Sequence, residues 1–173
     1  YVSGFQKAAL LSVDGLGDFS SAMMGVGSGA KIEILNSVQY PHSLGVFYTA
    51  MTQYLGYPYY GEEYKVMGLA SYGSPKYLKE MREIVKLQSD GAFSLNLKYF
   101  QHHSKGMSMS YACGSPDIVQ IYSSELEKLL GPVRKKGEDV TQRHIDIASS
   151  AQKMYEEALF HMLKCLHQLT RLD

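Results

Sequence analysis

The sequence predicts an α/β domain in which helices pack on a mixed sheet. Short apolar runs near the N-terminus have the length of strands and are separated by glycine-rich turns. Two later segments, residues 44–55 and 141–169, repeat apolar residues at helical spacing. At 173 residues the chain is the size of one domain and can bury a core.

Composition excludes several classes of partner. Lysine plus arginine balance aspartate plus glutamate at 17 each, so net charge gives no indication of nucleic acid or of an acidic membrane surface. No apolar run approaches the length of a membrane span. The two cysteines, Cys113 and Cys165, are far apart and have no metal-ligand spacing, as in an intracellular protein with reduced thiols. We therefore expect a cytoplasmic protein that binds neither nucleic acid nor membrane.

The first strand, residues 7–13, runs directly into a turn that contains two glycines between two aspartates. In such a turn the amides of Gly15 and Gly17 can bind phosphate, or Asp14 and Asp18 can bind a metal. An ordinary hairpin turn is the competing interpretation, because Asp and Gly are the commonest turn residues.

Two further strands are expected at residues 20–24 and 31–38, with the glycine-rich residues 25–29 as the hairpin between them. The second of these alternates Ile32 and Ile34 with charged residues, which is typical of a strand. Together with residues 7–13 they predict three antiparallel strands that lead into a helix.

A buried helix is predicted next. Pro41 and Ser43 form a start signal, because a serine side chain can accept a bond from the free amides of the first turn. Gly56 supplies the left-handed residue that ends a helix. The apolar residues at helical spacing are Leu44, Phe47, Tyr48, Met51 and Leu55.

A second, shorter helix is expected at residues 61–70. Glu63 and Lys65 at its start can be read as a solvated ion pair, which contributes little to stability. Gly68 lies in the middle of this pattern, where glycine costs about 1 kcal/mol relative to alanine. We therefore expect a packing or ligand reason for Gly68.

The second half of the chain is predicted to contain two amphipathic helices, at residues 75–86 and 117–130, with a small hairpin at Asp90-Gly91 between them. The basic residues 134–136 are expected to be a solvated loop tip. A long core helix of about seven turns is predicted from Thr141.

Histidines do not form a metal site in this reading. His102 and His103 are neighbours and point in different directions, and no third ligand is spaced to help them. The histidines along the long helix, His144, His161 and His167, are too far apart to share one face.

Four segments have an order and spacing that closely resemble the carbamoyltransferases of the nodulation-protein and antibiotic-tailoring type. They read LSVDGLGD at residues 11–18, PHSLGVFY at 41–48, LGY at 55–57 and EYKVMGLASYG at 63–73. The resemblance covers about residues 8–73. The long helix from Thr141 is also similar to the one that precedes the second glycine-rich nucleotide loop of that family.

The resemblance implies a portion of an actin-like ATPase domain, with a ribonuclease-H-like mixed sheet and packed helices. It also implies an enzyme that uses carbamoyl phosphate and ATP to form carbamoyl adenylate. The carbamoyl group then passes to a hydroxyl or amine of a small-molecule acceptor, such as a sugar or natural product.

Site residues follow from the same resemblance. Asp14 matches a metal-ligand aspartate, for iron or another divalent ion shared with residues outside this chain. Gly15 and Gly17 match amides that face the carbamoyl and phosphate groups. Glu63 and Lys65, with Gly68 in the same helix, match a helix start that faces the ribose and base.

The resemblance places other parts of the site outside residues 1–173. A histidine pair is expected before Tyr1, and a second glycine loop and a C-terminal domain after Asp173. We therefore expect one partial domain that works with the rest of its own polypeptide and is inactive alone. The alternatives are a non-catalytic nucleotide-binding module of the same fold, or a relative of the enzymes that make threonylcarbamoyl adenosine in tRNA. The neutral charge argues against the tRNA enzyme.

Overall fold

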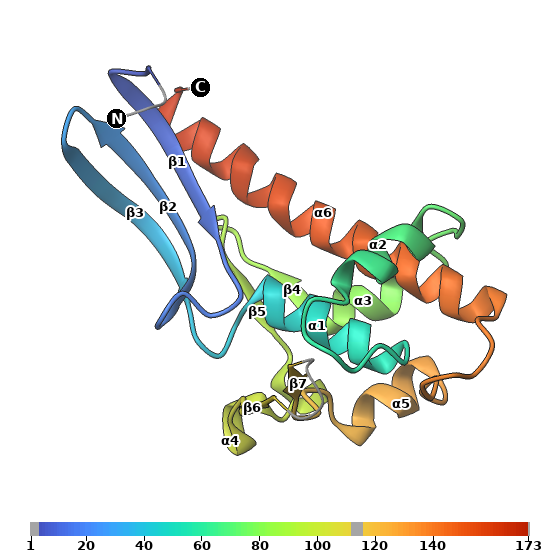
Figure 1. The fold of residues 1–173 in the computed structure, drawn as a ribbon. Helices are drawn as coiled ribbons and strands as arrows, with labels where there is room; N and C mark the ends of the chain where they lie inside the picture. The colour runs from blue at the N-terminus through green and yellow to red at the C-terminus, as the bar shows by residue number, and fades with distance from the viewer. Residues whose placement is uncertain (1–3, 112–115, 173) are drawn as a thin grey trace.

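A computed structural model describes residues 4–111 and 116–172, which form a mixed α/β arrangement (Figure 1). In this described part, three antiparallel strands make the largest sheet, the pairs β4-β5 and β6-β7 make two smaller antiparallel sheets, and helices fill the other side. The elements are β1 Lys7–Val13, β2 Ser20–Ser28, β3 Lys31–Gln39, α1 Leu44–Tyr54, α2 Glu63–Ala70, α3 Leu78–Ile84, β4 Val85–Leu87, β5 Phe93–Leu95, η1 Leu97–Tyr99, α4 His102–Lys105, β6 Met109–Ser110, β7 Asp117–Ile118, α5 Ser124–Leu130 and α6 Gln142–Thr170.

The β1-β2-β3 sheet confirms the three antiparallel strands, but the predicted hairpin at residues 25–29 is wrong. β2 continues to Ser28, which pairs with Lys31 across a tighter turn. Gly25 pairs with Leu10 and Ile34 inside the sheet, where a Cβ would lie 2.6 Å from the carbonyl oxygen of Glu33. Gly25 therefore allows a close approach of neighbouring strands, and of the predicted hairpin glycines only Gly29, with φ +57°, lies in the turn.

The two main predicted helices are confirmed. Ser43 caps α1, where its hydroxyl accepts a hydrogen bond from the Val46 amide at 3.1 Å. Gly56 follows α1 with φ +83°, in the left-handed region that ends helices. The long helix α6 begins after Thr141, and the Thr141 and His144 side chains form a capping box.

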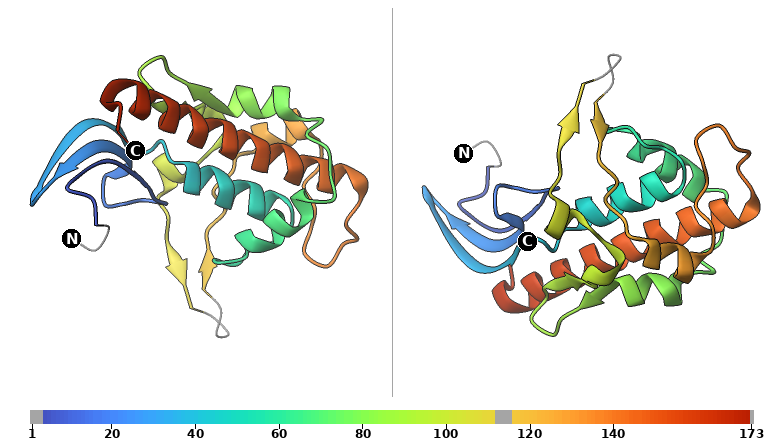
Figure 2. Two further views of the ribbon diagram at one scale, coloured as in Figure 1. Left: turned by 90° about the horizontal axis from the view of Figure 1, so that it is seen from above. Right: turned by 90° about the horizontal axis from the view of Figure 1, so that it is seen from below.

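α6 connects the sheet to the other helices. One part of it lies beside β1 and β2, and the rest packs against α1, α2 and α3 (Figures 1 and 2). Fully buried Phe47 and Met51 of α1, and Ile147 and Met154 of α6, belong to one continuous core. Helices and sheet are therefore stabilised by the same apolar cluster.

The chain after α2 differs from expectation at two helices. The helix predicted at residues 75–86 ends at Ile84, and Val85 begins β4, whose hairpin with β5 around Gly91 is confirmed. The helix predicted at residues 117–130 begins only at Ser124, capped by Ser123. Its first two expected residues instead form β7, which pairs with β6, and the residues from 119 to Ser123 belong to no helix or strand. Ser115, expected just before that helix, lies outside the described residues.

The prediction of a solvated tip at residues 134–136 is wrong for Arg134, which is only 8% exposed. Its guanidinium donates to the Leu55 carbonyl at 2.8 Å and to the Glu138 carbonyl. At the end of α1, Arg134 therefore satisfies the Leu55 carbonyl through its guanidinium and the Tyr54 carbonyl through its backbone amide.

No metal cluster is present among the described residues, in the sense that no three His, Cys, Asp or Glu side chains are grouped to hold an ion. His102 is buried and its Nε2 lies 2.8 Å from the Pro41 carbonyl oxygen, so this histidine is part of the core. Cys165 is a free thiol, and Cys113 lies outside the described residues. In the parts of the chain that the structure describes, no helix combines the length and the apolar character needed to cross a membrane.

Asp146 of α6 holds the segment that follows α2. Its buried carboxylate accepts hydrogen bonds from the Ser74 backbone amide at 3.1 Å, the Gln142 side-chain amide at 3.0 Å and the Lys76 ammonium at 2.7 Å. The ion pair with Lys76, followed by the Ser74 amide, lowers the pKa of this carboxyl to about 2 from 3.8.

Acid is therefore expected to weaken the fold through Asp146. The pKa of Asp146 is lower in the folded state, so the unfolded chain binds more protons as the pH falls below 3.8. The stabilisation that Asp146 contributes is therefore complete above pH 3.8 and is lost as the pH falls through about 2. Urea unfolding of wild type and Asp146→Asn at pH 5 and pH 2.5 measures this. Asp139→Asn, in an exposed loop, is the control. Asp146→Asn should lose less stability between pH 5 and pH 2.5 than either wild type or Asp139→Asn. Equal losses in all three proteins would contradict the prediction.

Candidate functional site

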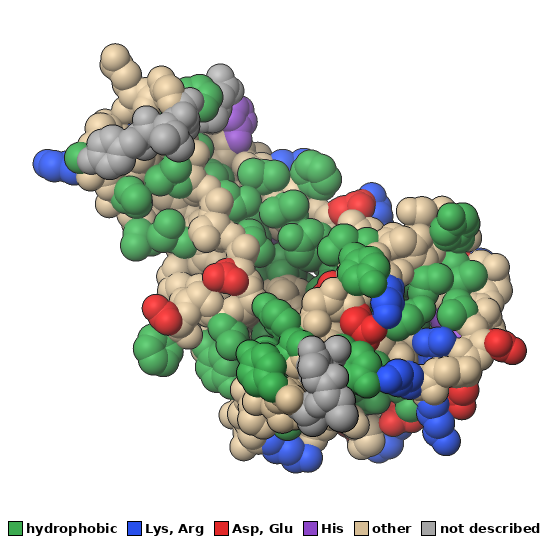
Figure 3. All heavy atoms as spheres, viewed as in Figure 1, with side chains coloured by type: hydrophobic (Ala, Val, Ile, Leu, Met, Phe, Trp, Pro, Cys, Tyr) green, Lys and Arg blue, Asp and Glu red, His purple; other side chains and the backbone are tan. Residues whose placement is uncertain are grey.

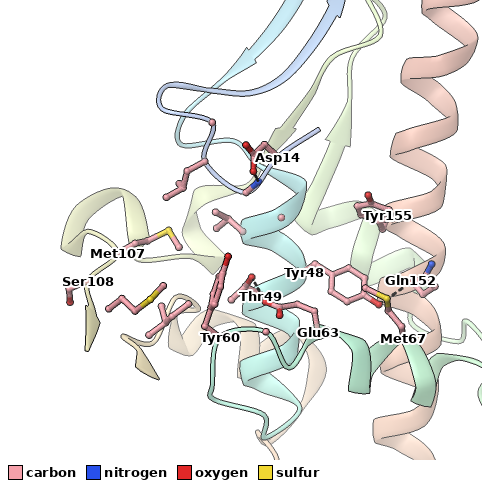
Figure 4. A pocket seen from close by; sticks show the side chains of 18 residues that line it. Asp14, Tyr48, Thr49, Tyr60, Glu63, Met67, Met107, Ser108, Gln152 and Tyr155 are labelled. Carbon is pink, nitrogen blue, oxygen red and sulfur yellow. Dashed lines mark hydrogen bonds between the residues drawn. The ribbon is translucent and has the colours of Figure 1, made fainter. Parts of the chain in front are cut away.

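A cavity of about 650 Å³ opens beside the turn that follows β1 (Figure 4). The turn residues 14–17 form one wall, and α1 forms the floor through residues 45–49. Residues 60–67 and α6 line one end, and residues 107–109 with Ile118 line the other. In the space-filling view, hydrophobic side chains gather across the middle of this face, and lysine and arginine side chains gather mainly at its helical end (Figure 3).

Asp14 enters the cavity from the end of β1. The Asp14 amide donates to the Ser21 carbonyl at 2.8 Å, which ties the turn to β2. Its exposed carboxylate accepts a hydrogen bond from the Gly15 amide at 2.6 Å through Oδ1. In this geometry the Gly15 amide is already used, so it can bind an anion only after the Asp14 side chain turns away.

Gly17 is required by the shape of the turn. Its φ is +51°, and a Cβ at this position would lie 2.3 Å from the carbonyl oxygen of Ser20. Gly17 and Asp14 both line the cavity, whereas Asp18, the second aspartate of the motif, does not. The two aspartates are thus not brought together as paired ligands facing this cavity.

Glu63 reaches the cavity from the first turn of α2. Its Oε1 accepts a hydrogen bond from the Thr49 hydroxyl of α1 at 2.7 Å (Figure 4). Lys65, two residues later, forms its ion pair with Glu62 at 2.5 Å and not with Glu63. The alternative reading of Glu63 and Lys65 as an ion pair is therefore wrong, and Thr49 orients the carboxylate of Glu63.

Tyr48, Gln152 and Tyr155 form a polar cluster at the α6 end of the cavity. The Tyr48 hydroxyl donates to Gln152 Oε1 at 2.8 Å, and the Tyr155 ring stands edge-on to the Tyr48 ring at 5.8 Å. Burial, followed by the neighbouring Tyr155, Glu156 and Glu63, raises the pKa of Tyr48. Tyr48 thus remains a protonated donor at neutral pH.

Four of the six residues predicted for the site are brought together here: Asp14, Gly15, Gly17 and Glu63 line one cavity. Lys65 and Gly68 are not among its lining residues. A Cβ on Gly68 would meet nothing within 4 Å, so the expected packing reason is not found.

Sequence reasoning missed Thr49, Tyr48, Gln152 and Tyr155, all of which line the cavity. Thr49 had a signal in the spacing of α1, because residues four apart lie on the same face of a helix. Thr49 lies four residues after Gly45, and that face of α1 packs against the Asp14 turn. The pairing of α1 with α6, which adds the other side chains, is a long-range contact without a local sequence signal.

The cavity is acidic. Asp14 and Glu63 are its charged residues, and no lysine, arginine or histidine belongs to its described lining. A phosphate group placed here would meet carboxylates without a compensating cation. The cavity therefore suits neutral groups such as hydroxyls, or anions that carry a divalent cation with them.

Asp14 fits one ligand position of a divalent metal. The carboxylate is exposed to the cavity, Oδ1 is held by Gly15, and carboxylate oxygen is a ligand that such ions accept. Because the described residues contain no group of three metal-binding side chains, a metal at Asp14 needs further ligands from elsewhere.

Comparison with known proteins gives several relatives. The chain is 34% identical to the uncharacterised protein sll1178 of Synechocystis over 175 residues, which cover 100% of this chain and 26% of that protein. It is 32% identical to the nodulation protein NolNO of Sinorhizobium fredii over 170 residues, 98% of this chain and 22% of the relative. Identity to the nodulation protein NolO of Bradyrhizobium diazoefficiens is 34% over 164 residues, 94% of this chain and 26% of the relative.

The chain thus spans about a quarter of the length of these relatives, from 22% to 26%. Residues 1–172, nearly the whole chain, also match the family described as Carbamoyltransferase N-terminus. The similarity to these relatives and the family match both agree with the resemblance that the four motifs carry. The chain belongs to the family of carbamoyltransferase N-terminal domains.

Proposed function

We propose that this chain is the substrate-binding part of an enzyme that forms carbamoyl adenylate from carbamoyl phosphate and ATP. The enzyme then transfers the carbamoyl group to a hydroxyl or amine of a small-molecule acceptor. We further propose that the described elements belong to an actin-like ATPase domain. The fragment is expected to be inactive without the rest of the polypeptide, because its cavity lacks the positive charge that phosphate groups require.

One observation carries the proposal: a single cavity brings together Asp14 and the glycines of the first motif with Glu63 of the fourth. The first motif ends at Asp18 and the fourth begins at Glu63, so the 44 residues 19–62, which include α1, separate them, yet both motifs face the same cavity. A shared cavity of this size is typical of a small-molecule site.

In the proposed arrangement Asp14 supplies a metal ligand and Glu63 binds the ribose. The Glu63 carboxylate, oriented by Thr49, accepts hydrogen bonds from ribose hydroxyls, which are charge-assisted and therefore strong. Tyr48 is held by Gln152 and closes the α6 end of the cavity. A divalent metal bound at Asp14 would neutralise phosphate charge and polarise the carbamoyl group.

The acidity of the cavity supports a dependence on a divalent cation. With two carboxylates and no basic side chain in its described lining, the cavity repels a bare phosphate. Chain residues from outside this fragment, a metal, or both must supply positive charge before carbamoyl phosphate or ATP binds.

The test is release of pyrophosphate from ATP by the full-length protein, measured with and without carbamoyl phosphate in the presence of a divalent cation. We expect release only when carbamoyl phosphate is present. ATP binding without any release would reject the transferase and favour a non-catalytic nucleotide-binding module. Modification of tRNA without any need for carbamoyl phosphate would favour the tRNA-modifying alternative.

A further inference from the structure

The geometry points to Ser43 as a positioning residue that sets the location of the Asp14 carboxylate. This inference rests on the proposed function, because it concerns the metal ligand in that site. Ser43 is 1% exposed, does not line the cavity, and therefore acts only through its neighbours.

The Ser43 hydroxyl makes contacts in two directions. It accepts a hydrogen bond from the Val46 amide of α1 at 3.1 Å, as in an ordinary helix cap. It also donates to the Gly15 carbonyl at 2.5 Å, with the Asp14 carbonyl oxygen 3.3 Å away. One side chain therefore joins the beginning of α1 to the turn that carries Asp14.

The contact continues to the carboxylate itself. The Asp14 carbonyl and the Gly15 amide belong to the same peptide unit, and that amide holds Asp14 Oδ1 at 2.6 Å. Ser43 bonds the Gly15 carbonyl of the next peptide and lies near the Asp14 carbonyl of this one, so it restricts rotation of the Asp14–Gly15 peptide and thereby the direction of its N–H bond. The direction of that bond decides where the carboxylate lies.

Gly45 makes this close approach possible. A Cβ on Gly45 would lie 2.6 Å from Gly15 Cα and 3.2 Å from the Asp14 carbonyl oxygen. The turn is therefore packed directly on the first turn of α1, and on its other side the Asp14 amide is bonded to Ser21 of β2. Helix and strand thus hold the turn from both sides, and Ser43 supplies the side-chain hydrogen bond on the helix side.

Ser123 offers a matched control, because it has the same kind of contacts at a different helix. It caps α5 by accepting a hydrogen bond from the Glu125 amide at 3.3 Å. Its hydroxyl also donates to the carbonyl of Lys98, 25 residues earlier in the sequence, at 2.6 Å. Ser123 does not line the cavity. Removing either hydroxyl should lower thermal stability, but only the loss at Ser43 should disturb Asp14.

The experiment measures binding of Mn²⁺ alone to the full-length protein by electron paramagnetic resonance, well below the melting temperature. We expect Ser43→Ala to weaken Mn²⁺ binding about tenfold, as for residues that orient metal ligands. Ser43→Thr, which keeps the hydroxyl, should restore binding, and Ser123→Ala should bind as wild type. Ser43→Gly is the second variant, since glycine is well tolerated at a helix cap and keeps the protein folded.

The outcomes separate the two proposals. If Asp14→Asn weakens Mn²⁺ binding while Ser43→Ala and Ser43→Gly do not, Asp14 is a ligand and the positioning role of Ser43 is wrong. Equal weakening by Ser43→Ala and Ser123→Ala would also reject it, because the effect would then follow stability. If Asp14→Asn leaves Mn²⁺ binding unchanged, the metal role of Asp14 in the proposed function fails as well.

Discussion

Asp14→Asn is expected to lower carbamoyl-phosphate-dependent pyrophosphate release by the full-length protein about a hundredfold or more, since even residues behind a metal ligand contribute 10–100-fold. Asparagine retains an oxygen that can accept the Gly15 amide, so the turn keeps its shape. The negative charge that would bind a divalent cation is lost. Steady-state assays at saturating ATP measure the change.

Asp18→Asn is the matched control for this variant. Asp18 lies in the same turn, does not line the cavity, and has φ +57°, a conformation that asparagine also tolerates. It should retain nearly full activity. Similar losses in both variants would show that the turn responds to a change in charge in general, and Asp14 would have no special role.

Glu63→Gln is expected to weaken ATP binding about ten- to a hundredfold, because hydrogen bonds to a charged group contribute roughly 1.5–3 kcal/mol. Glutamine preserves the shape of the side chain and its contact with Thr49 but removes the charge. Calorimetric titration of the full-length protein with Mg²⁺ and ATP measures the affinity. If the carboxylate binds the ribose, wild type should prefer ATP to 2′-deoxy-ATP, and the variant should lose this preference.

Glu62→Gln tests whether position matters. Glu62 directly precedes Glu63 but pairs with Lys65 and does not line the cavity, so its loss should leave ATP affinity close to that of wild type. An unchanged affinity in Glu63→Gln, or an equal drop in Glu62→Gln, would remove Glu63 from the nucleotide site.

Local signals predicted the elements that are determined locally. The start of α1 at Ser43 and its end near Gly56 follow from capping chemistry, and the periodicity of α6 alone identifies a long core helix. Asp14 and Glu63 were proposed as site residues from the resemblance of their motifs to the carbamoyltransferase family. The structure places both at one cavity, and their roles there stay predictions.

The errors arise where a distant partner decides the structure. Gly25 was read as a turn residue, but it pairs with Leu10 and Ile34 within the sheet, at a point where the Glu33 carbonyl approaches too closely for a side chain. Arg134 was read as solvated, but its partner is the carbonyl of Leu55, 79 residues earlier. The strand β7 was read as helix because its pairing with β6 and its bridge to Tyr59 are not visible in local sequence.

The position of α6 in the chain has a consequence for synthesis on the ribosome. This helix is the last described element, yet it packs against the first strands and against α1, α2 and α3. The faces of β1, β2 and α1 that pack against α6 therefore remain uncovered while residues 55–141 are translated, and native contacts of such long sequence separation form slowly. Asp14 and Glu63 are made before α6, so the end of the cavity that Gln152 and Tyr155 line forms only after residues 142–170 have emerged.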